Sequence, residues 1–495
     1  MRRRSRIWLV ILAPIALWIS LMSWAFASPV GSSPDDVYHM ASIWCGGGVK
    51  DGICEAGDRL QDRRVPETLV SASGCFSYQP EQSAACEPPP STDLVNTKRG
   101  NFTGSYPPVY YTTLSIFAGP NVETSIMAMR TFNATLFVGI LTLVFALSPA
   151  RLKTPLVWAV TATIVPLGMF IVASVNPSSW AVLAGATLWV VLTAFYGETR
   201  KNRRILLAVM AILLTIMGSG ARADSAIYSG VAVLVAAALS FEKTRRFAVS
   251  SILGVVVIVT ALFFFFTAGQ SALLEPAELT GTISLTALVF GNLVLLPELW
   301  VGVFGTYGLG WLDTFMPGSV WVPLVTVFAA LSFWGMQVWG LRKALAASIV
   351  AFSLIIVPMY VFVHDQVMVG GYVQPRYIYP LLIMFLGVLL VRLGNPSLGL
   401  RPVQTLTLVF LVSVANTIAL HVNIRRYVTG IDVSSPNLDA GAEWWWSLPV
   451  GPIWIWILGS VSFVVFAFLV PTVLSPVTRL RTKQSSLFRD TRTLD

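Results

Sequence analysis

The chain has few charged residues. Only 12% of its 495 residues are Asp, Glu, Lys or Arg, and its mean hydropathy is +0.72, whereas about 25% of the residues in an average soluble domain are charged. This scarcity excludes an ordinary soluble enzyme. Apolar runs of about 20 residues, the length that crosses a bilayer, recur along the whole chain. They predict an all-α polytopic membrane domain over residues 1–475, embedded in the lipid bilayer, and a basic cytoplasmic tail over 476–495.

Cysteine is scarce as well, and it is confined to one polar segment. All four cysteines stand outside the apolar runs. Their even number and clustering predict two disulfides in an oxidising compartment. Local pairing, Cys45 with Cys54 and Cys75 with Cys86, is the simplest of the three connectivities. Zinc is the alternative, but the spacings lack the short Cys-x-x-Cys pattern of zinc ligands.

The sequence also lacks a long basic stretch. Its net charge is +9, but the Lys and Arg residues form short clusters between apolar runs. Basic residues in that position act as topology signals. Nucleic acid is therefore not an expected partner.

Length and hydropathy predict about twelve transmembrane helices. Placing the starting sequence "MRRRSR" inside collects most Lys and Arg on the inner side, as the positive-inside rule requires. We therefore predict a multi-pass protein of the plasma membrane with both termini cytoplasmic and with a first extracytoplasmic loop over 28–126. The predicted spans are 7–27, 127–147, 155–174, 178–196, 204–220, 224–240, 247–268, 320–340, 344–363, 376–392, 403–422 and 452–474.

Two segments have an alternative interpretation. Residues 283–301 are apolar enough to span, but a crossing there would reverse every later basic loop. We therefore predict an extracytoplasmic loop over 269–319 that holds a re-entrant or surface-lying helix, broken at Pro297-Glu298. The first apolar run ends in "AFA" before Ser28, as a cleavable signal peptide does, although its length favours a retained helix.

Ionisable residues gather at the outer ends of the predicted spans. In "GSSPDDVYHM", Ser33 and Pro34 predict a helix start with Asp35 and Asp36 in its first turn. A helix start alone accounts for both carboxylates. It does not account for His39, which shares a helical face with Asp35. A carboxylate and an imidazole on one face can hold a metal, orient an acceptor hydroxyl or deprotonate it.

Three further charged residues lie at depths that require a partner or a water-filled cavity. Arg222 and Asp224 stand in a short hairpin between two spans, and Arg376 stands where a helix enters the membrane. They can pair with each other or extend to the interface. Together they also describe a pocket for a phosphate beside a carboxylate base, because the guanidinium group forms two parallel charged hydrogen bonds to phosphate.

Aromatic residues accompany this outer face. Tyr106 lies in "GSYPPVYY", and Trp311 and Asp313 lie in "FGTYGLGWLDTFMPGSVW". Rings at the interface usually anchor a membrane protein, but rings around a polar cavity also stack on sugars. With His364, which falls on the same side, these residues are candidate substrate contacts.

Six motifs in chain order resemble those of a known family. They are "SPDDVYH", "YPPVYY", "NPSSWA", "ARADSAIY", "GLGWLDTFMP" and "QPRYIYPLL". An acidic pair directly after the first transmembrane helix resembles the hallmark of the GT-C superfamily of membrane glycosyltransferases. The six motifs together resemble the predicted membrane-protein family called domain of unknown function 2142, over most of the chain. That family's usual pair is Asp-Glu followed by His, whereas this chain has Asp35-Asp36, which leaves open which of the two acts.

The resemblance implies a GT-C-like fold and an inverting enzyme of the cell envelope. Such enzymes transfer a sugar from a polyprenyl-phosphate donor to a glycan or glycolipid acceptor on the outer face. A transporter or flippase of lipid-linked glycans, or a polymerase or ligase of such glycans, is the alternative. A transporter predicts charges at the bilayer midplane, whereas this sequence places them at one face.

The resemblance also implies roles for particular residues. Asp35 or Asp36 is the expected general base, with His39 beside it. Some members of the superfamily hold a divalent cation such as Mg or Mn at the acidic residues, here Asp35, Asp36 and His39, and others do not. The arginines expected to neutralise the departing lipid phosphate are Arg222 and Arg376, together with Arg425 or Arg426.

Overall fold

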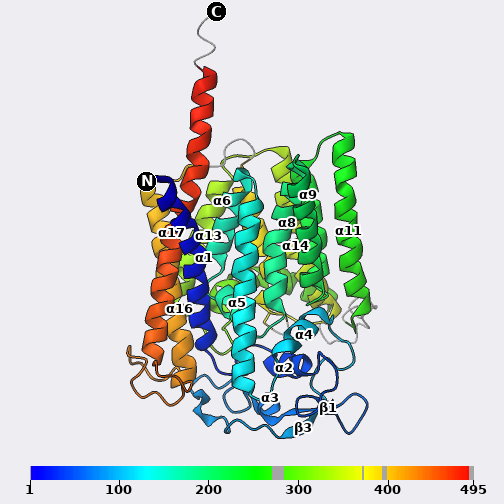
Figure 1. Ribbon diagram of the computed structural model, residues 1–495, viewed down its shortest axis with the longest axis vertical. Helices are drawn as coiled ribbons and strands as arrows, with labels where there is room; N and C mark the ends of the chain where they lie inside the picture. The colour runs from blue at the N-terminus through cyan, green and yellow to red at the C-terminus, as the bar shows by residue number, and fades with distance from the viewer. Residues whose placement is uncertain (1, 270–283, 371–372, 393–397, 490–495) are drawn as a thin grey trace, which may run out of the picture.

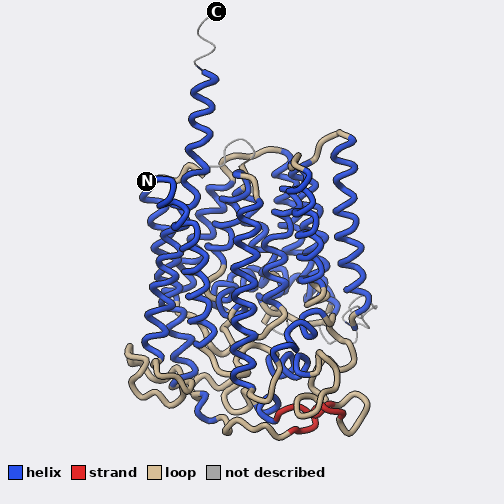
Figure 2. Tube along the Cα trace, in the orientation of Figure 1, coloured by secondary structure: helices blue, strands red, loops and turns tan. Residues whose placement is uncertain are grey.

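The chain folds into a bundle of helices that stand roughly parallel to one another (Figure 1). The computed structural model describes residues 2–269, 284–370, 373–392 and 398–489. The N-terminus and the end of the last helix lie at one end of the bundle, which we call the terminal end. The strands and most of the loops lie at the opposite end, the loop end, as Figure 2 shows.

Within these described residues, nine helices are long and apolar enough to cross a membrane. They confirm a polytopic membrane protein. They are α5 (Val122–Leu147), α8 (Ser178–Gly197), α9 (Lys201–Ser219), α11 (Arg245–Thr267), α12 (Leu285–Val301) continued by η4 (Gly302–Thr306), α13 (Gly318–Gly335), α14 (Leu341–His364), α16 (Pro402–Val428) and α17 (Pro452–Arg489). Three shorter apolar helices are Ile11–Phe26 within α1 (Arg2–Phe26), α10 (Ser225–Ser240) and α15 (Tyr379–Leu390).

The predicted span over 155–174 is wrong as a single helix. The structure has two helices there, α6 (Ala150–Thr163) and α7 (Leu167–Val172). The break falls at Pro166, which has no backbone N–H to continue the helical hydrogen bonds and whose ring clashes with the preceding turn.

The predicted break at Pro297-Glu298 is also wrong. Helix α12 continues through Pro297 to Val301, and the chain turns instead at Gly305. The φ angle of Gly305 is 107°, a conformation that glycine adopts without the steric cost of a side chain.

Helix α12 packs against α14 and the residues that follow it. The side chain of Asn292 donates to the carbonyl of Val367 at 2.9 Å and accepts from the N–H of Val369 at 2.7 Å. Further along, Trp300 Nε1 donates to the carbonyl of Leu354, within α14, at 3.3 Å. The re-entrant or surface-lying character of this segment stays a prediction.

Helix α8 is the most deeply buried of the long helices. Its most apolar window is 100% buried, against 28% for α11. Glycine allows the closest contacts around it: a Cβ added to Gly185 would lie 2.5 Å from Pro380 Cβ of α15, and one added to Gly218 of α9 would lie 2.6 Å from Ala184 Cβ. Small residues at such interfaces let helix backbones approach one another.

The loop end is built mainly from residues 28–121. The two disulfides predicted there, Cys45–Cys54 and Cys75–Cys86, are confirmed. An antiparallel sheet has the strand order β1-β2-β3. The elements are α2 (Asp36–Trp44), β1 (Glu55–Ala56), β2 (Arg63–Pro66), α3 (Glu67–Ser71), η1 (Ala84–Cys86), β3 (Leu94–Thr97), α4 (Val109–Leu114) and η2 (Ser115–Phe117).

The segment between α16 and α17 binds this first loop to the rest of the bundle. The N–H of Ile431 donates to the carbonyl of Pro80 at 3.1 Å, and Ser83 Oγ donates to Glu443 Oε2 at 2.5 Å. The first and last thirds of the chain therefore meet at the loop end.

Candidate active site

Residues 25–34, the end of α1 and most of the linker that leads to α2, are held by buried side chains from distant parts of the chain. Arg130 of α5, which is 1% exposed, donates to the carbonyls of Ala25, Ser28 and Pro29 at 2.6–2.7 Å. Other carbonyls of the linker accept from Asn423, Trp311, Tyr427, Asn176 and Arg376. We call this segment the clamped linker. It fixes the backbone directly before the acidic pair.

The acidic pair begins α2 in a different way from the one predicted. The helix starts at Asp36, and Asp35 is its N-cap residue with a left-handed φ of 62°. The predicted start at Pro34 is wrong because the carbonyl of Pro34 accepts from Asn176 and Arg376 at 3.0 and 3.3 Å instead of from a helical N–H.

Asp35 is paired with Arg376. Arg376 Nη2 lies 2.5 Å from Asp35 Oδ2; the arginine side chain is 2% exposed, whereas the aspartate side chain is 47% exposed. Burial alone would raise the pKa of Asp35, but the guanidinium of Arg376, with smaller contributions from His39 and Arg222, holds this pKa below its ordinary value. A buried cation thus presents an ionised, accessible carboxylate.

A second ion pair stands beside the first. Arg222, in the short turn between α9 and α10, donates from Nε and Nη2 to the carboxylate of Asp224 at 3.0 and 2.7 Å. The guanidinium carbons of Arg222 and Arg376 lie 4.9 and 5.1 Å from the centre of the Tyr377 ring. The structure therefore brings four of the predicted residues together around one tyrosine.

A cavity of about 440 Å³ opens next to these pairs. Its polar residues include Tyr106, Arg222, Asp224, Tyr377 and Asp365.

The rest of the cavity lining is mostly apolar, and much of it comes from α10, α11 and α14. It includes Ile227, Phe265, Ile356, Val357 and Val361. Ile227 and Ile356 are 40% and 55% exposed, so this part of the lining is continuous with the outer surface of the bundle. The cavity can receive a molecule with an anionic part and a long apolar part.

Asp36 does not share the environment of Asp35. It is 1% exposed, and its Oδ2 accepts from the N–H of Ser33 at 3.1 Å. Burial raises the pKa of Asp36 to about 7. The second carboxylate of the pair is thus part of the packing beneath the site.

His39 is also enclosed. It is 1% exposed, and its Nδ1 lies 3.0 Å from the hydroxyl of Tyr111. Burial lowers the pKa of His39 to about 3, so the imidazole is neutral. Its ring meets the Tyr106 ring edge-on at 5.6 Å, which places His39 behind a residue of the cavity wall.

The three predicted metal ligands do not converge. Asp35 is bonded to Arg376, Asp36 to the N–H of Ser33, and His39 to Tyr111. Over the whole described part of the chain, no group of three or more His, Cys, Asp or Glu side chains is arranged to hold a metal ion. This residue set does not fit a divalent cation, and the function proposed below uses none.

Four other predicted contacts lie away from the cavity, in the packing of the loop end. Arg426 donates to Asp313 Oδ2 and to the carbonyls of Phe76 and Gln82, each at 2.7 Å. Arg425 donates to the carbonyls of Ser435 and Asn437 at 2.5 and 2.7 Å. Trp311 Nε1 donates to the carbonyl of Gly31 at 2.9 Å.

His364 has an intermediate position. Its Nδ1 lies 2.7 Å from Asp365 Oδ1, and Asp365 lines the cavity.

Sequence reasoning did not assign Arg130, Asn176 or Tyr377 to the site. Arg130 carried a signal, because an arginine within an apolar run needs a specific partner. Tyr377 was adjacent to a predicted residue. Asn176 opens the motif "NPSSWA", but an asparagine before a proline is also common in ordinary turns, so the motif alone did not give this residue a role.

The fold and the site define a polytopic α-helical membrane protein that has two arginine–aspartate ion pairs close together at the loop end of its bundle. The chain belongs to the family described as predicted membrane protein (DUF2142), whose model matches residues 17–386. This confirms the resemblance to that family. The matched region contains both ion pairs of the site and ends before Arg425 and Arg426. No curated protein and no solved structure matches the chain.

Proposed function

We propose that the protein transfers a sugar from a polyprenyl-phosphate donor to a hydroxyl group of a cell-envelope glycan or glycolipid. The observation that supports this is the mixed polar and apolar lining of the cavity. Arg222 and Asp224 line the cavity, the Asp35–Arg376 pair stands next to them against the same Tyr377 ring, and α10, α11 and α14 contribute apolar residues to the lining. A lipid-linked sugar has the same two parts, an anionic phosphate and a long apolar chain.

Asp35 is the general base in this proposal. Its carboxylate is accessible, whereas Asp36 is buried under the clamped linker. Asp35 takes the proton of the acceptor hydroxyl as the acceptor oxygen bonds to the anomeric carbon. The bond from that carbon to the phosphate oxygen breaks, and its electron pair leaves with the lipid phosphate. Attack opposite to the leaving group inverts the anomeric configuration.

Arg222 and Arg376 stabilise the departing phosphate. A leaving phosphate gains negative charge in the transition state, so fixed cations stabilise that state more than the ground state. In the structure Arg222 is neutralised by Asp224, and Arg376 is neutralised by Asp35. We propose that the donor phosphate replaces Asp35 as the partner of Arg376. This exchange frees Asp35 from the cation that lowers its basicity, so donor binding activates the base.

The experiment is a transfer assay with the full chain in lipid nanodiscs. Labelled polyprenyl-phosphate sugars are supplied with a glycolipid fraction from a cell envelope, and covalent products are separated. Asp35→Asn should lower turnover by about 10²–10⁴-fold, the usual contribution of a general base. Asp58→Asn, in an exposed turn of the first loop, is the matched control and should leave turnover unchanged.

Two results would contradict the proposal. Undiminished transfer by the Asp35→Asn protein would show that Asp35 is not the general base. Movement of a labelled lipid across a vesicle membrane with no new covalent bond would support the transporter alternative.

A further inference from the structure

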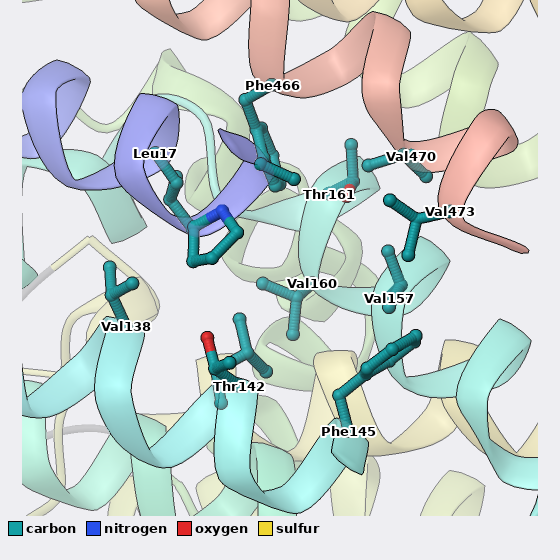
Figure 3. Close-up of a pocket in the computed structure, with 13 residues that line it drawn as sticks. Leu17, Val138, Thr142, Phe145, Val157, Val160, Thr161, Phe466, Val470 and Val473 are labelled. Carbon is teal, nitrogen blue, oxygen red and sulfur yellow. The ribbon is translucent and has the colours of Figure 1, made fainter. Parts of the chain in front are cut away.

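A second hollow lies between α1, α5, α6 and α17, apart from the cavity at the loop end. Its volume is about 80 Å³. Figure 3 shows side chains of all four helices directed into one space, with Val138 and Thr142 of α5 facing Val160 of α6, and with Phe466 of α17 close by. We call this hollow the apolar groove.

The apolar groove has a buried floor and accessible rims. Leu17 and Val160 of the floor are 1% and 3% exposed. At the rims, Phe145 and Val157 are partly exposed and Thr142 is exposed. A groove of this kind on the side of a membrane bundle is open to the hydrocarbon of the bilayer.

A cation stands at the end of the apolar groove nearest the terminal end of the bundle. Lys153 lies in the first turns of α6, one helical turn before Val157 and therefore on the same face. Its Nζ lies 4.6 Å from the centre of the Phe145 ring, which lines the groove. Arg203 of α9 is close to the same place, because its Nη2 donates to the carbonyl of Leu147 at the end of α5 at 2.6 Å.

We propose that the apolar groove and Lys153 together bind an anionic phospholipid of the leaflet at the terminal end. One acyl chain lies along the groove, and the headgroup phosphate meets Lys153. The order of the two parts supports this assignment: the cation stands at the membrane surface, and the apolar walls continue from it toward the bilayer centre. The donor proposed above is a different lipid at a different place, since its arginines stand at the loop end. This site is independent of the proposed function.

The test uses the full chain in nanodiscs with phosphatidylglycerol that carries a photoreactive group in one acyl chain. Crosslinked peptides are mapped by mass spectrometry. We expect labelling to concentrate on the α5, α6 and α17 peptides of the groove. Thr142→Trp, which fills the groove from its rim, should lower that labelling several-fold. Leu143→Trp is the matched control, because Leu143 is the next residue of α5, is 39% exposed and does not line the groove.

The headgroup is tested separately by competition with phosphatidylcholine. Lys153→Gln should reduce the preference for phosphatidylglycerol about fivefold, the usual effect of one basic residue near a membrane surface. Equal labelling of the Thr142→Trp and Leu143→Trp proteins would overturn the acyl-chain site. An unchanged headgroup preference in Lys153→Gln would overturn the anionic assignment.

Discussion

Two adjacent aspartates in this chain have different physical states. Asp35 is accessible and bound to a buried arginine, whereas Asp36 is buried and accepts from a backbone N–H. The pKa of Asp35 lies below its ordinary value, and that of Asp36 is raised to about 7. When the surroundings of two carboxyl groups separate their pKa values in this way, the two groups are expected to have different roles. Within the proposed mechanism, the accessible and ionised Asp35 is therefore the expected base.

The partner exchange at Arg376 predicts a particular pH dependence of transfer. The kcat/KM profile reports the base in the free enzyme, and the kcat profile reports it in the donor complex. The charged and titratable groups around Asp35 include Arg376, Arg222, His39, Asp36 and Tyr106. If the donor phosphate takes Arg376, the acid limb of kcat lies at a higher pH than that of kcat/KM. Coincident acid limbs in steady-state kinetics would contradict the exchange.

Asp36 should make the stability of the protein depend on pH. Its folded pKa is about 7 because of burial, which is above its pKa in the unfolded chain. The folded protein therefore binds this proton more tightly, and stability falls as the pH rises from about 4 to about 7. In Asp36→Asn this contribution is absent.

The measurement is thermal unfolding in detergent at about pH 5 and about pH 8. The midpoint of the wild type should fall more than that of Asp36→Asn over this range. Equal changes in the two proteins would show that Asp36 does not carry the linkage.

At the residue scale, sequence predicted which side chains need partners but not always which partners they have. Arg222 and Asp224 are two positions apart, so their pairing could be inferred locally, and the structure shows it. Arg426 is paired with Asp313, which lies 113 positions away. Which residues pair over such a separation depends on how the helices pack against one another. A single sequence does not show this packing.

At the scale of helices, the contact between α8 and α15 depends on the absence of one side chain. A Cβ on Gly185 would lie 2.5 Å from Pro380 Cβ, closer than carbon atoms can pack. Gly185→Ala should therefore destabilise the protein by about 1–3 kcal/mol, the usual cost of overpacking. Because α15 follows Arg376 directly, the same change should also lower transfer.

The matched control is another helical glycine. A Cβ on Gly139 of α5 meets nothing within 4 Å, so Gly139→Ala should be neutral or slightly stabilising, because alanine has the higher helix propensity. Thermal unfolding of both variants in one detergent checks the pair. Equal midpoints would contradict the close contact.

Helix existence was predictable here, and helix ends were less so. Hydropathy identified the long helices because a bilayer requires about 20 apolar residues. The division of α6 from α7 and the continuity of α12 through Pro297 did not follow, since a proline inside an apolar run either ends or bends a helix according to its neighbours. Local sequence contains the proline but not those neighbours.

At the scale of the whole molecule, Arg426 joins three regions. It lies near the end of α16, and it contacts the first loop at Phe76 and Gln82 and the segment after η4 at Asp313. Its side chain is fully buried. Removing one partner of a buried ion pair lowers the free energy of unfolding by about 3–5 kcal/mol, because the remaining charge stays buried without an opposite charge beside it.

Arg426→Gln should therefore lower the thermal stability and expose the loop closed by the Cys75–Cys86 disulfide to proteases. Arg59→Gln, at an exposed position of the first loop, is the control of equal charge change. Limited proteolysis with peptide mapping measures the effect. Identical cleavage rates in the two variants would show that Arg426 does not join these regions.

The clamped linker has a consequence for the time at which the protein becomes competent during its synthesis. Residues 25–34 leave the ribosome early, but the donors that bind their carbonyls follow at positions 130, 176, 311, 376, 423 and 427. The backbone before Asp35 can reach its final shape only when α16 has been inserted. Every shorter nascent chain lacks part of this support, so the backbone before Asp35 is fixed among the last events of assembly.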